Sequence, residues 1–344
     1  MNRHPGTIGI LVEDDKRRKP ALRTYMLHKP ARMKLVCFTP SSIDWRRRQI
    51  RCLQLRNGKW TEGLVPLPKL VYNRCYRLDD EVRDRLEQAI GPGKLFNPAN
   101  QFNKLDVHRS LSRWLSPYLP DTWAYDRDTA ARLLSVHKLL YLKPCNGHMG
   151  QGVYRVALQD SGEVHVADHH TTPRIIAGSI AGFQEEIERL IGSTPYLIQQ
   201  GIEVRQLQHR HFDIRILAQK NKTGQWSVTN AASRIAYPGC FNTSVSEKVV
   251  LSKEALGRLY PASAIKPMMK TMYDISLRAA EIVEMDIGKP MCELSVDIAL
   301  DGQGHPWIIE MNGKPQKTMY AELRHTRRAV YSRPLEYANY LSRR

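Results

Sequence analysis

Three oxygen-bearing side chains, those of Asp297, Glu310 and Asn312, flank a turn in the last part of the chain. The turn is Asp-Gly-Gln-Gly at residues 301–304, with strand-like runs on both sides, so a β-hairpin is predicted. Centring the turn between its third and fourth residues places Asp297 opposite Glu310, and strand alternation puts Asn312 on the same face. Facing carboxylates repel unless a cation lies between them, and Mg²⁺ takes such oxygen ligands together with phosphate groups. The hairpin therefore predicts a magnesium site.

The same register assigns the other face of the hairpin to the core. It places Ala299 opposite Ile308. The apolar side chains that it turns inward are those of Val296, Ile298, Leu300, Trp307, Ile309 and Met311. In a second interpretation the acids lie at the surface and pair with Lys314 or Lys317. The sequence leaves both open, because a slip of one residue exchanges the two faces.

A glycine-rich segment, Lys-Pro-Cys-Asn-Gly-His-Met-Gly-Gln-Gly at residues 143–152, could hold phosphate groups. It lies between two predicted strands, so it is neither the Walker-type loop nor the dinucleotide fingerprint, both of which lead into a helix. Three glycines in six residues still let backbone N–H groups approach phosphate oxygens, and Lys143 would add a positive charge. An ordinary glycine-containing hairpin explains the same residues. The pair His148-Met149 has no physical explanation from the sequence.

A strictly alternating run at residues 211–217 predicts a strand with two unlike faces. One face carries His211, Asp213 and Arg215, and the other carries Phe212, Ile214 and Ile216. The polar face should line a site, and Arg234, after another predicted strand, could be a second cation facing phosphate. Surface ion pairs are the commoner explanation for such arginines. His209 and His211 have no third partner that would favour a metal site.

Composition limits the function classes. The 344 residues include 52 Lys and Arg against 34 Asp and Glu, a net charge of +18, which attracts nucleic acid or phosphorylated and acidic ligands. The basic runs at 16–19 and 46–48 lack a nucleic-acid motif, so solvated surface is the preferred interpretation and nucleic acid is not an expected partner. The six cysteines are scattered and indicate neither zinc nor disulfides. No apolar run reaches the ~20 residues of a membrane span, so a cytoplasmic location is expected.

The elements that must position these residues follow from periodicity and caps. Predicted helices cover 79–90, 104–115, 128–137, 183–191, 253–259 and 267–283. Predicted strands cover 7–12, 34–38, 50–55, 70–72, 139–143, 153–158, 196–200, 212–219, 226–233, 291–300 and 307–311. Asn57-Gly58 is a predicted hairpin turn. Together these helices and strands predict α+β lobes that follow one another along the chain.

On these residues the sequence resembles the ATP-grasp superfamily, most closely its YheC/YheD-type, endospore coat-associated branch. The resemblance covers nearly the whole chain. Its motifs are Val71–Arg74, Phe102–Leu105, Tyr141–Pro144 with Asn146–Gly152, Leu197–Ile202, Phe212–Arg215, Ala232–Arg234, Trp307–Asn312 and Lys314-Pro315. It implies an α+β ATP-grasp fold, with two α+β lobes clasping ATP after a small α/β N-terminal domain. The implied domains are 1–98, 99–198, which carries the glycine-rich flap, and 199–344, which carries the magnesium and phosphate site.

The resemblance also implies a role for each matching position. Lys104 and Lys143 would touch the nucleotide phosphates. The flap would close over the phosphates and contact them through Asn146, Gly147, Gly150 and Gly152. The segment whose backbone contacts adenine would be Gln199, Gln200, Gly201 and Ile202. Glu203 would contact the ribose. Arg215 and Arg234 would be catalytic, facing the γ-phosphate or an acyl phosphate, and Asp297, Glu310 and Asn312 would hold magnesium. Many family members carry Glu where this chain has Asp297, and both are hard oxygen ligands.

The function that the resemblance implies is an ATP- and Mg²⁺-dependent, ADP-forming ligase that joins a carboxylate to an amine through an acyl phosphate. Its partners would be ATP, an acidic or peptidic acceptor and an amine, in the mother-cell cytoplasm or at the spore coat. The expected acceptor residues are Asn73, Arg74, His211, Asp213, Asn242 and Thr243, with the pocket expected near Phe241–Ser244 and Tyr72–Arg74. Two alternatives stay open: an ATP-grasp kinase, and a nucleotide-binding structural protein of the spore coat without turnover.

Overall fold

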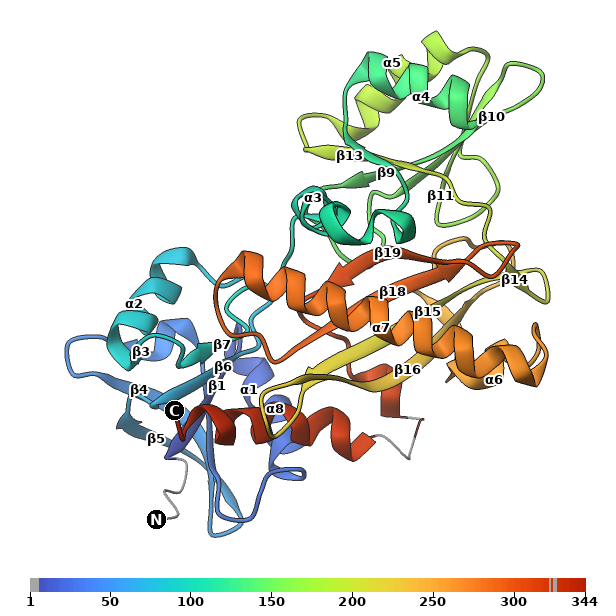
Figure 1. The fold of residues 1–344 in the computed structure, drawn as a ribbon. Coiled ribbons are helices and arrows are strands. Elements are labelled where there is room, and N and C mark those ends of the chain that lie inside the picture. The colour runs from blue at the N-terminus through green and yellow to red at the C-terminus, as the bar shows by residue number, and fades with distance from the viewer. Residues whose placement is uncertain (1–5, 322, 324–326) are drawn as a thin grey trace.

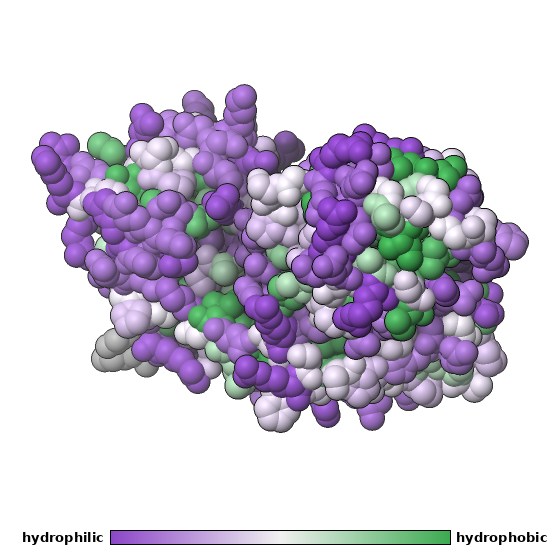
Figure 2. Space-filling model, turned by 90° about the horizontal axis from the view of Figure 1, so that it is seen from above, coloured by the Kyte–Doolittle hydropathy of each residue, from purple (hydrophilic) through white to green (hydrophobic). Residues whose placement is uncertain are grey.

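The computed structural model describes residues 6–321, 323 and 327–344, and it arranges them as three sheets with helices packed against them (Figure 1). The predicted α+β class is confirmed. Residues 1–5, at the start of the predicted domain 1–98, lie outside the described part. None of the helices in the described part is both long and apolar enough to cross a bilayer. The face shown in Figure 2 is mostly hydrophilic, with hydrophobic residues in small groups.

The first sheet has seven strands, in the order β3-β4-β2-β1-β6-β7, with β5 paired to β4. The strands are β1 (Thr7–Leu11), β2 (Lys34–Phe38), β3 (Ile43–Asp44), β4 (Gln49–Arg56), β5 (Lys59–Pro66), β6 (Leu70–Asn73) and β7 (Leu95–Phe96). Helices α1 (Asp15–Met26) and α2 (Asp80–Ile90) accompany them, with a short 3₁₀ turn, η1 (Pro40–Ser42). The predicted turn between β4 and β5 is confirmed, because Asn57 and Gly58 have φ of 50° and 76°, which these residues adopt readily.

The second sheet is antiparallel, in the order β12-β11-β10-β9-β13-β8. Its strands are β8 (Thr122–Ala124), β9 (Leu139–Pro144), β10 (Tyr154–Leu158), β11 (Val164–Asp168), β12 (Ile175–Ala177) and β13 (Tyr196–Gln200). Helices α4 (Arg127–His137) and α5 (Ile180–Ile191) pack together on this sheet. Asp126 and Ser179 cap them by accepting backbone N–H bonds in the first turn. Figure 1 shows this lobe standing apart from the other two sheets.

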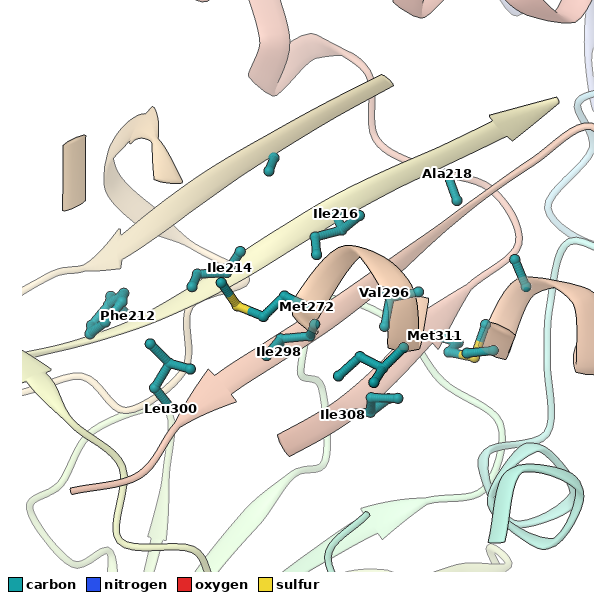
Figure 3. Packing of buried hydrophobic residues seen from close by; sticks show 14 of the residues in the cluster. Phe212, Ile214, Ile216, Ala218, Met272, Val296, Ile298, Leu300, Ile308 and Met311 are labelled. Carbon is teal, nitrogen blue, oxygen red and sulfur yellow. The ribbon is translucent and has the colours of Figure 1, made fainter. Parts of the chain in front are cut away.

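The third sheet is antiparallel, in the order β17-β16-β15-β18-β19, with β14 paired to β15. Its strands are β14 (Gln206–Leu207), β15 (Arg210–Lys220), β16 (Trp226–Ala236), β17 (Ser246–Leu251), β18 (Glu293–Leu300) and β19 (Pro306–Asn312). The helices near it are α3 (Lys104–Leu115), α6 (Ser252–Leu256) and α7 (Ala262–Ile287), with 3₁₀ turns η2 (Ser116–Tyr118) and η3 (Thr318–Ala321). The long α7 covers one face, where apolar side chains of β15, β18 and β19 pack beneath it (Figure 3). The opposite face carries the polar residues Asp213, Arg234 and Asp297, while Leu217 and Ala232 on it pack against Tyr320 and Val330.

The last helix, α8 (Arg327–Leu341), packs against the first sheet although it follows the third in the chain. Its side chains Leu335, Tyr337 and Ala338 join the core formed by β1, β2 and β6. The helix also touches β15 and β16, so it lies where the first and third sheets meet. The predicted boundary between the second and third domains, at residue 199, stays a prediction.

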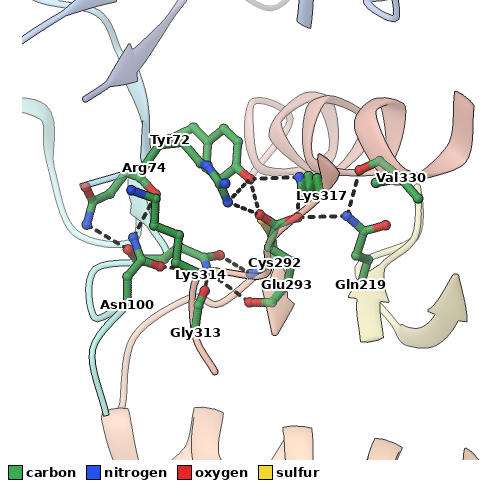
Figure 4. Close-up of polar contacts among 12 residues, drawn as sticks. Tyr72, Arg74, Asn100, Gln219, Cys292, Glu293, Gly313, Lys314, Lys317 and Val330 are labelled. Atoms are coloured by element: carbon green, nitrogen blue, oxygen red, sulfur yellow. Dashed lines mark hydrogen bonds and ion pairs between the residues drawn. The ribbon is translucent and has the colours of Figure 1, made fainter. Parts of the chain in front are cut away.

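A buried ionic network joins the first and third sheets (Figure 4). Glu293, which is fully buried, pairs with Arg74 at 2.5 Å and with Lys317 at 2.6 Å. It also accepts hydrogen bonds from Tyr72 and from the side-chain amide of Gln219. Burial alone would raise the pKa of Glu293, but Lys317 and Arg74 hold it below the ordinary glutamate value. The carboxylate is therefore charged, and it ties four segments together.

Parts of the predicted organisation need correction. The basic run at 16–19 lies inside α1, where the Arg18 side chain is 9% exposed and pairs with Glu62, so the prediction of solvated surface is wrong for that residue. Helix α7 begins five residues before Pro267, because a proline early in a helix removes only one bond to the first turn. No helix was predicted over α1 or α8, and no strand was predicted over β8, β11, β12 or β17.

Candidate functional site

A cleft of about 1030 Å³, counting its open mouth, lies between the second and third sheets. Strands β9 and β13 of the second sheet form one side, and β15, β16, β18 and β19 of the third form the other. Fourteen of the predicted site residues line it: Lys104, Lys143, Gly147, Gly150, Gln199, Gln200, Ile202, His211, Asp213, Arg234, Asn242, Thr243, Asp297 and Glu310. The structure thus brings together residues from distant parts of the sequence.

The β18–β19 hairpin has the predicted pairing at its functional end. Asp297 lies directly opposite Glu310, and Ser295 lies opposite Asn312. The pairing then shifts by one residue between Asp297 and Ile298, so Ala299 faces Trp307, and the predicted pair Ala299 with Ile308 is wrong. A β-bulge of this kind inserts one residue into one strand and reverses the facing of the residues beyond it.

The bulge also changes which apolar residues reach the core. Ile308 enters the core beside α7, while Ile309 lines the cleft next to Glu310. The predicted inward facing of Ile309 is therefore wrong. The strand pattern indicated strict alternation, and only the three-dimensional pairing shows where it breaks.

Two arginines and two aspartates form a ladder across β15, β16 and β18. Arg215 donates to both oxygens of Asp297, at 2.7 and 2.6 Å, and Arg234 donates to the same carboxylate at 2.9 Å. Arg234 also makes a two-pronged contact with Asp213. All four side chains are at least 89% buried. The predicted alternation of this segment is confirmed, since Phe212, Ile214 and Ile216 join the opposite, apolar face.

The ladder fixes the charge of its carboxylate. Burial would raise the pKa of Asp297, but Arg215 and Arg234 hold it below the ordinary aspartate value. Burial likewise opposes the charge of Arg234, whereas Asp213 and Asp297 raise its pKa. The alternative in which the hairpin acids pair with nearby lysines is wrong, because Lys314 pairs with Glu13 and Lys317 with Glu293.

Two lysines lie at the same end of the hairpin, on the side of Glu310. Lys104, the first residue of α3, lies 3.2 Å from Glu310. Its placement follows from Asn103, which caps α3 as predicted by accepting two backbone N–H bonds. Lys143, at the end of β9, donates to Gln199 at 2.6 Å. Burial lowers the pKa of Lys143 to about 8, with the charge of Lys104 acting in the same direction and Glu310 against it.

The oxygen donors fit a magnesium ion bound together with phosphate. Asp297 and Glu310 supply facing carboxylates, and the buried side-chain nitrogen of Asn312 has no hydrogen-bond partner in the described chain. An orphaned amide of this kind, turned the other way, offers its oxygen instead. The described residues contain no group of three or more His, Cys, Asp and Glu side chains placed to hold a metal ion by themselves. Two carboxylates with substrate phosphates are a usual magnesium set, and Asn312 does not line the cleft in this structure.

The glycine-rich flap reaches over the cleft from β9 and β10. Gly147 and Gly150 line the cleft, and Gly150 has a φ of 68°, which glycine adopts without strain. On the far side, the loop that contains Asn242 lies against it: a side chain added at Gly150 would meet the Asn242 amide. Asn242 also contacts His169 of the second sheet at 2.9 Å. The loop therefore touches both the flap and the sheet that bears it.

The remaining predicted site residues lie beside the cleft and do not line it. Asn146 and Glu203 are exposed, Gly152 lies against Tyr196, and Gly201 donates its N–H to Leu139. Arg215 and Asn312 lie behind the lining, on β15 and β19. Asn73 donates to the backbone of Asn97, and Arg74 belongs to the Glu293 network. The geometry gives no support to an acceptor role for Asn73 and Arg74.

The cleft has an apolar wall, most of which was not predicted. Tyr141 and Phe241 meet edge to face, with ring centroids 5.8 Å apart, and both line the cleft with Val204 and Ile309. Tyr141 lies two residues before Lys143 on β9, so strand alternation from Lys143 could have placed it on the same face. Ile309 carries no such signal, because a bulge positions it. These apolar surfaces suit a flat ring such as a nucleobase.

Comparison with known proteins adds sequence and fold relationships. A family model described as YheC/D like ATP-grasp matches residues 93–341. Endospore coat-associated protein YheD from Bacillus subtilis (strain 168) is 28% identical over 331 residues, covering 92% of this chain and 72% of that protein. Endospore coat-associated protein YheC from the same strain is 23% identical over 325 residues, covering 90% and 88%. The crystal structure of D-alanyl-alanine synthetase A from Vibrio cholerae O1 biovar eltor matches with a TM-score of 0.60 and 14% identity over 99% of each chain.

Proposed function

The chain belongs to the YheC/D-like ATP-grasp family, and from that premise we propose that it is an ATP- and Mg²⁺-dependent ligase that joins a carboxylate to an amine. One observation carries the proposal. Four cationic side chains, Lys104, Lys143, Arg215 and Arg234, converge with the carboxylates of Asp213, Asp297 and Glu310 at one end of the cleft. This excess of positive charge favours a polyphosphate, and the facing pair Asp297 and Glu310 suits its divalent ion.

The proposed reaction has two steps. The carboxylate oxygen of the acceptor attacks the γ-phosphorus of ATP, the bond to the β-phosphate oxygen breaks, and ADP leaves. An amine then attacks the carbonyl carbon of the acyl phosphate, inorganic phosphate leaves, and the amine loses a proton. Both steps need positioning and charge neutralisation, and neither needs a nucleophilic side chain from the protein.

The described side chains suit these needs. Lys143 and Lys104 lie beside Glu310, where they can neutralise phosphate oxygens, and Tyr141 and Phe241 provide an apolar wall for the adenine. Arg234, which lines the cleft, would face the phosphoryl group as it transfers. Arg215 does not line the cleft and would act through Asp297 by holding its carboxylate in place. A bound magnesium ion would add Lewis-acid stabilisation of the phosphate charge.

A nucleotide-binding protein without turnover is the second candidate. It is favoured by the pairing of Asp297 with two arginines, because the carboxylate is neutralised without any metal. The names of the two relatives, both endospore coat-associated, are compatible with it. The acceptor and the amine are not identified by the cleft, whose lining beyond the phosphate end includes His211, Asn242 and Thr243.

The test is a Mg²⁺-dependent screen for ADP and phosphate release across carboxylic acids, acidic peptides and amines. Release that requires both an acid and an amine, and that is lost in Glu310→Ala, supports the ligase. Asp44→Ala, which removes an exposed acid of the first sheet, is the matched control and should behave like the wild type. ADP formation with the γ-phosphate retained on the acceptor would show a kinase, and tight ATP binding without ADP would show the second candidate.

A further inference from the structure

The flap contacts a tyrosine of the N-terminal domain, in addition to the second sheet and the loop that contains Asn242. Tyr76 follows β6, and its ring lies 4.8 Å from the ring of His148 in the flap, tilted by 51°. Its hydroxyl donates to the backbone oxygen of Gly147 at 3.2 Å. Lys104 donates to the same oxygen at 3.0 Å. The flap tip therefore contacts the N-terminal domain as well as the lobe from which it extends.

The backbone of Tyr76 is itself anchored. Its N–H donates to Glu13 at 2.6 Å, and Glu13 pairs with Lys314, which follows the β18–β19 hairpin. The preceding Cys75 N–H donates to the buried Asn73 side chain. The ring of Tyr76 is thus presented by a fixed segment, whereas His148 lies on a glycine-rich one. A contact between a fixed and a mobile element restrains the mobile one.

The residue after His148 indicates how the flap is shaped. Met149 has a φ of 58°, a conformation that costs a non-glycine residue free energy, and its side chain is 58% exposed. The glycines at 147 and 150 bracket this strained position. A strained turn persists only where surrounding contacts hold it, and here those contacts are made by the neighbouring residues Gly147 and His148.

We propose that Tyr76 is a positioning residue that latches the flap to the N-terminal domain through His148 and Gly147. The latch lies close to Glu310, because Lys104 donates to Gly147 and also lies 3.2 Å from the Glu310 carboxylate. An acceptor that enters between the N-terminal domain and the flap meets the latch first, so its entry is coupled to enclosure of the nucleotide. That coupling rests on the proposed function, whereas the latch itself does not.

The decisive experiment is hydrogen exchange of the flap amides, residues 147–152, in the nucleotide-free protein. Tyr76→Ala and His148→Ala should each exchange about tenfold faster there, because one hydrogen bond or one ring contact of ordinary strength is lost. Tyr76→Phe keeps the ring contact and should show a smaller increase, and His148→Phe should be close to the wild type. Tyr118→Ala removes a similar tyrosine–histidine contact, with His305, away from the flap, and should leave the flap unchanged.

A second measurement separates a latch from a merely structural role. Dissociation of a fluorescent ATP analogue should be faster in Tyr76→Ala by about the same factor, while the urea midpoint of Tyr76→Phe stays that of the wild type. Unchanged flap exchange in a folded Tyr76→Ala protein would overturn the proposal. If flap exchange changes as expected but the protein forms no ADP with any acceptor, the latch is supported and the ligase function is rejected.

Discussion

The carboxylate of Asp297 accepts hydrogen bonds from two arginines and faces Glu310 across the hairpin. In Asp297→Asn the side chain keeps its shape but loses its charge, so Arg215 and the proposed magnesium ion both lose a charged partner. We expect Mg²⁺-dependent ADP release to fall on the order of 100-fold, as for other disrupted metal environments. Steady-state kinetics with Asp44→Asn as the control measures this. Full activity in Asp297→Asn would exclude the carboxylate as a ligand.

Lys143 should make nucleotide binding depend on pH. Its pKa of about 8 lies below the ordinary lysine value, so above pH 8 the amine of the nucleotide-free protein is neutral. Phosphate favours the charged amine, so binding then takes up a proton. The Kd for ATP should be flat below pH 8 and rise above it by up to about tenfold per pH unit.

The matched variant for this prediction is Lys143→Arg. A guanidinium stays protonated throughout this range, so the rise above pH 8 should disappear if the variant folds and binds. Calorimetric titrations in two buffers of different ionisation enthalpy would count the proton directly. A rise that persists in Lys143→Arg would assign the titration to another group.

At the scale of elements, a substitution of Arg74 distinguishes a structural role of this residue from a role in acceptor binding. It pairs with the fully buried Glu293 at the junction of the first and third sheets. Arg74→Met leaves that carboxylate with one cation fewer, and we expect a loss of about 3 kcal/mol in the free energy of unfolding. Urea denaturation measures this loss. The control is Arg83→Met, which removes the Arg83–Asp80 ion pair of α2 and should lose less than about 1 kcal/mol. Unchanged stability with a raised acceptor KM would restore the acceptor role.

Most elements were predictable because their signals are local. Asn103 and Asp79 cap helices that begin where the sequence indicates, and alternation around Asp213 assigns both faces of β15. The bulge after Asp297 was not predictable, because it depends on how two strands pair. Helix α8 was missed because its apolar residues face two different cores and give no single stripe.

In the candidate site, too, the residues with local sequence signals were predictable and those placed by long-range packing were not. Residues on strands, such as Lys143 and Asp297, were predicted from the alternation or the resemblance and do line the cleft. Asn73 and Arg74 belong to the motif Val71–Arg74, yet their side chains turn into the interior. Ile309, which a bulge turns toward the cleft, needed the folded chain. Long-range packing, which no short window of sequence records, decides these cases.

For the whole molecule, ligand binding should be visible as stability. The cleft is built from two sheets, so a nucleotide that contacts both favours the folded state by mass action. At a concentration of 100 Kd, Mg²⁺-ATP should add about 2.7 kcal/mol, a shift of several degrees in Tm. Thermal unfolding with Mg²⁺-ATP, and with AMP as the control that lacks the β- and γ-phosphates, measures it. Equal shifts with both would place the binding energy at the base and not at the phosphate end.

The return of α8 to the first sheet has a consequence for how the chain folds during synthesis. Leu335, Tyr337 and Ala338 complete the core around β1, β2 and β6, but the ribosome makes them after both other sheets. The first sheet must therefore wait, with part of its apolar face uncovered, while the rest of the protein emerges. Nascent chains stopped before α8 should bind chaperones through this face and release them once the helix is made.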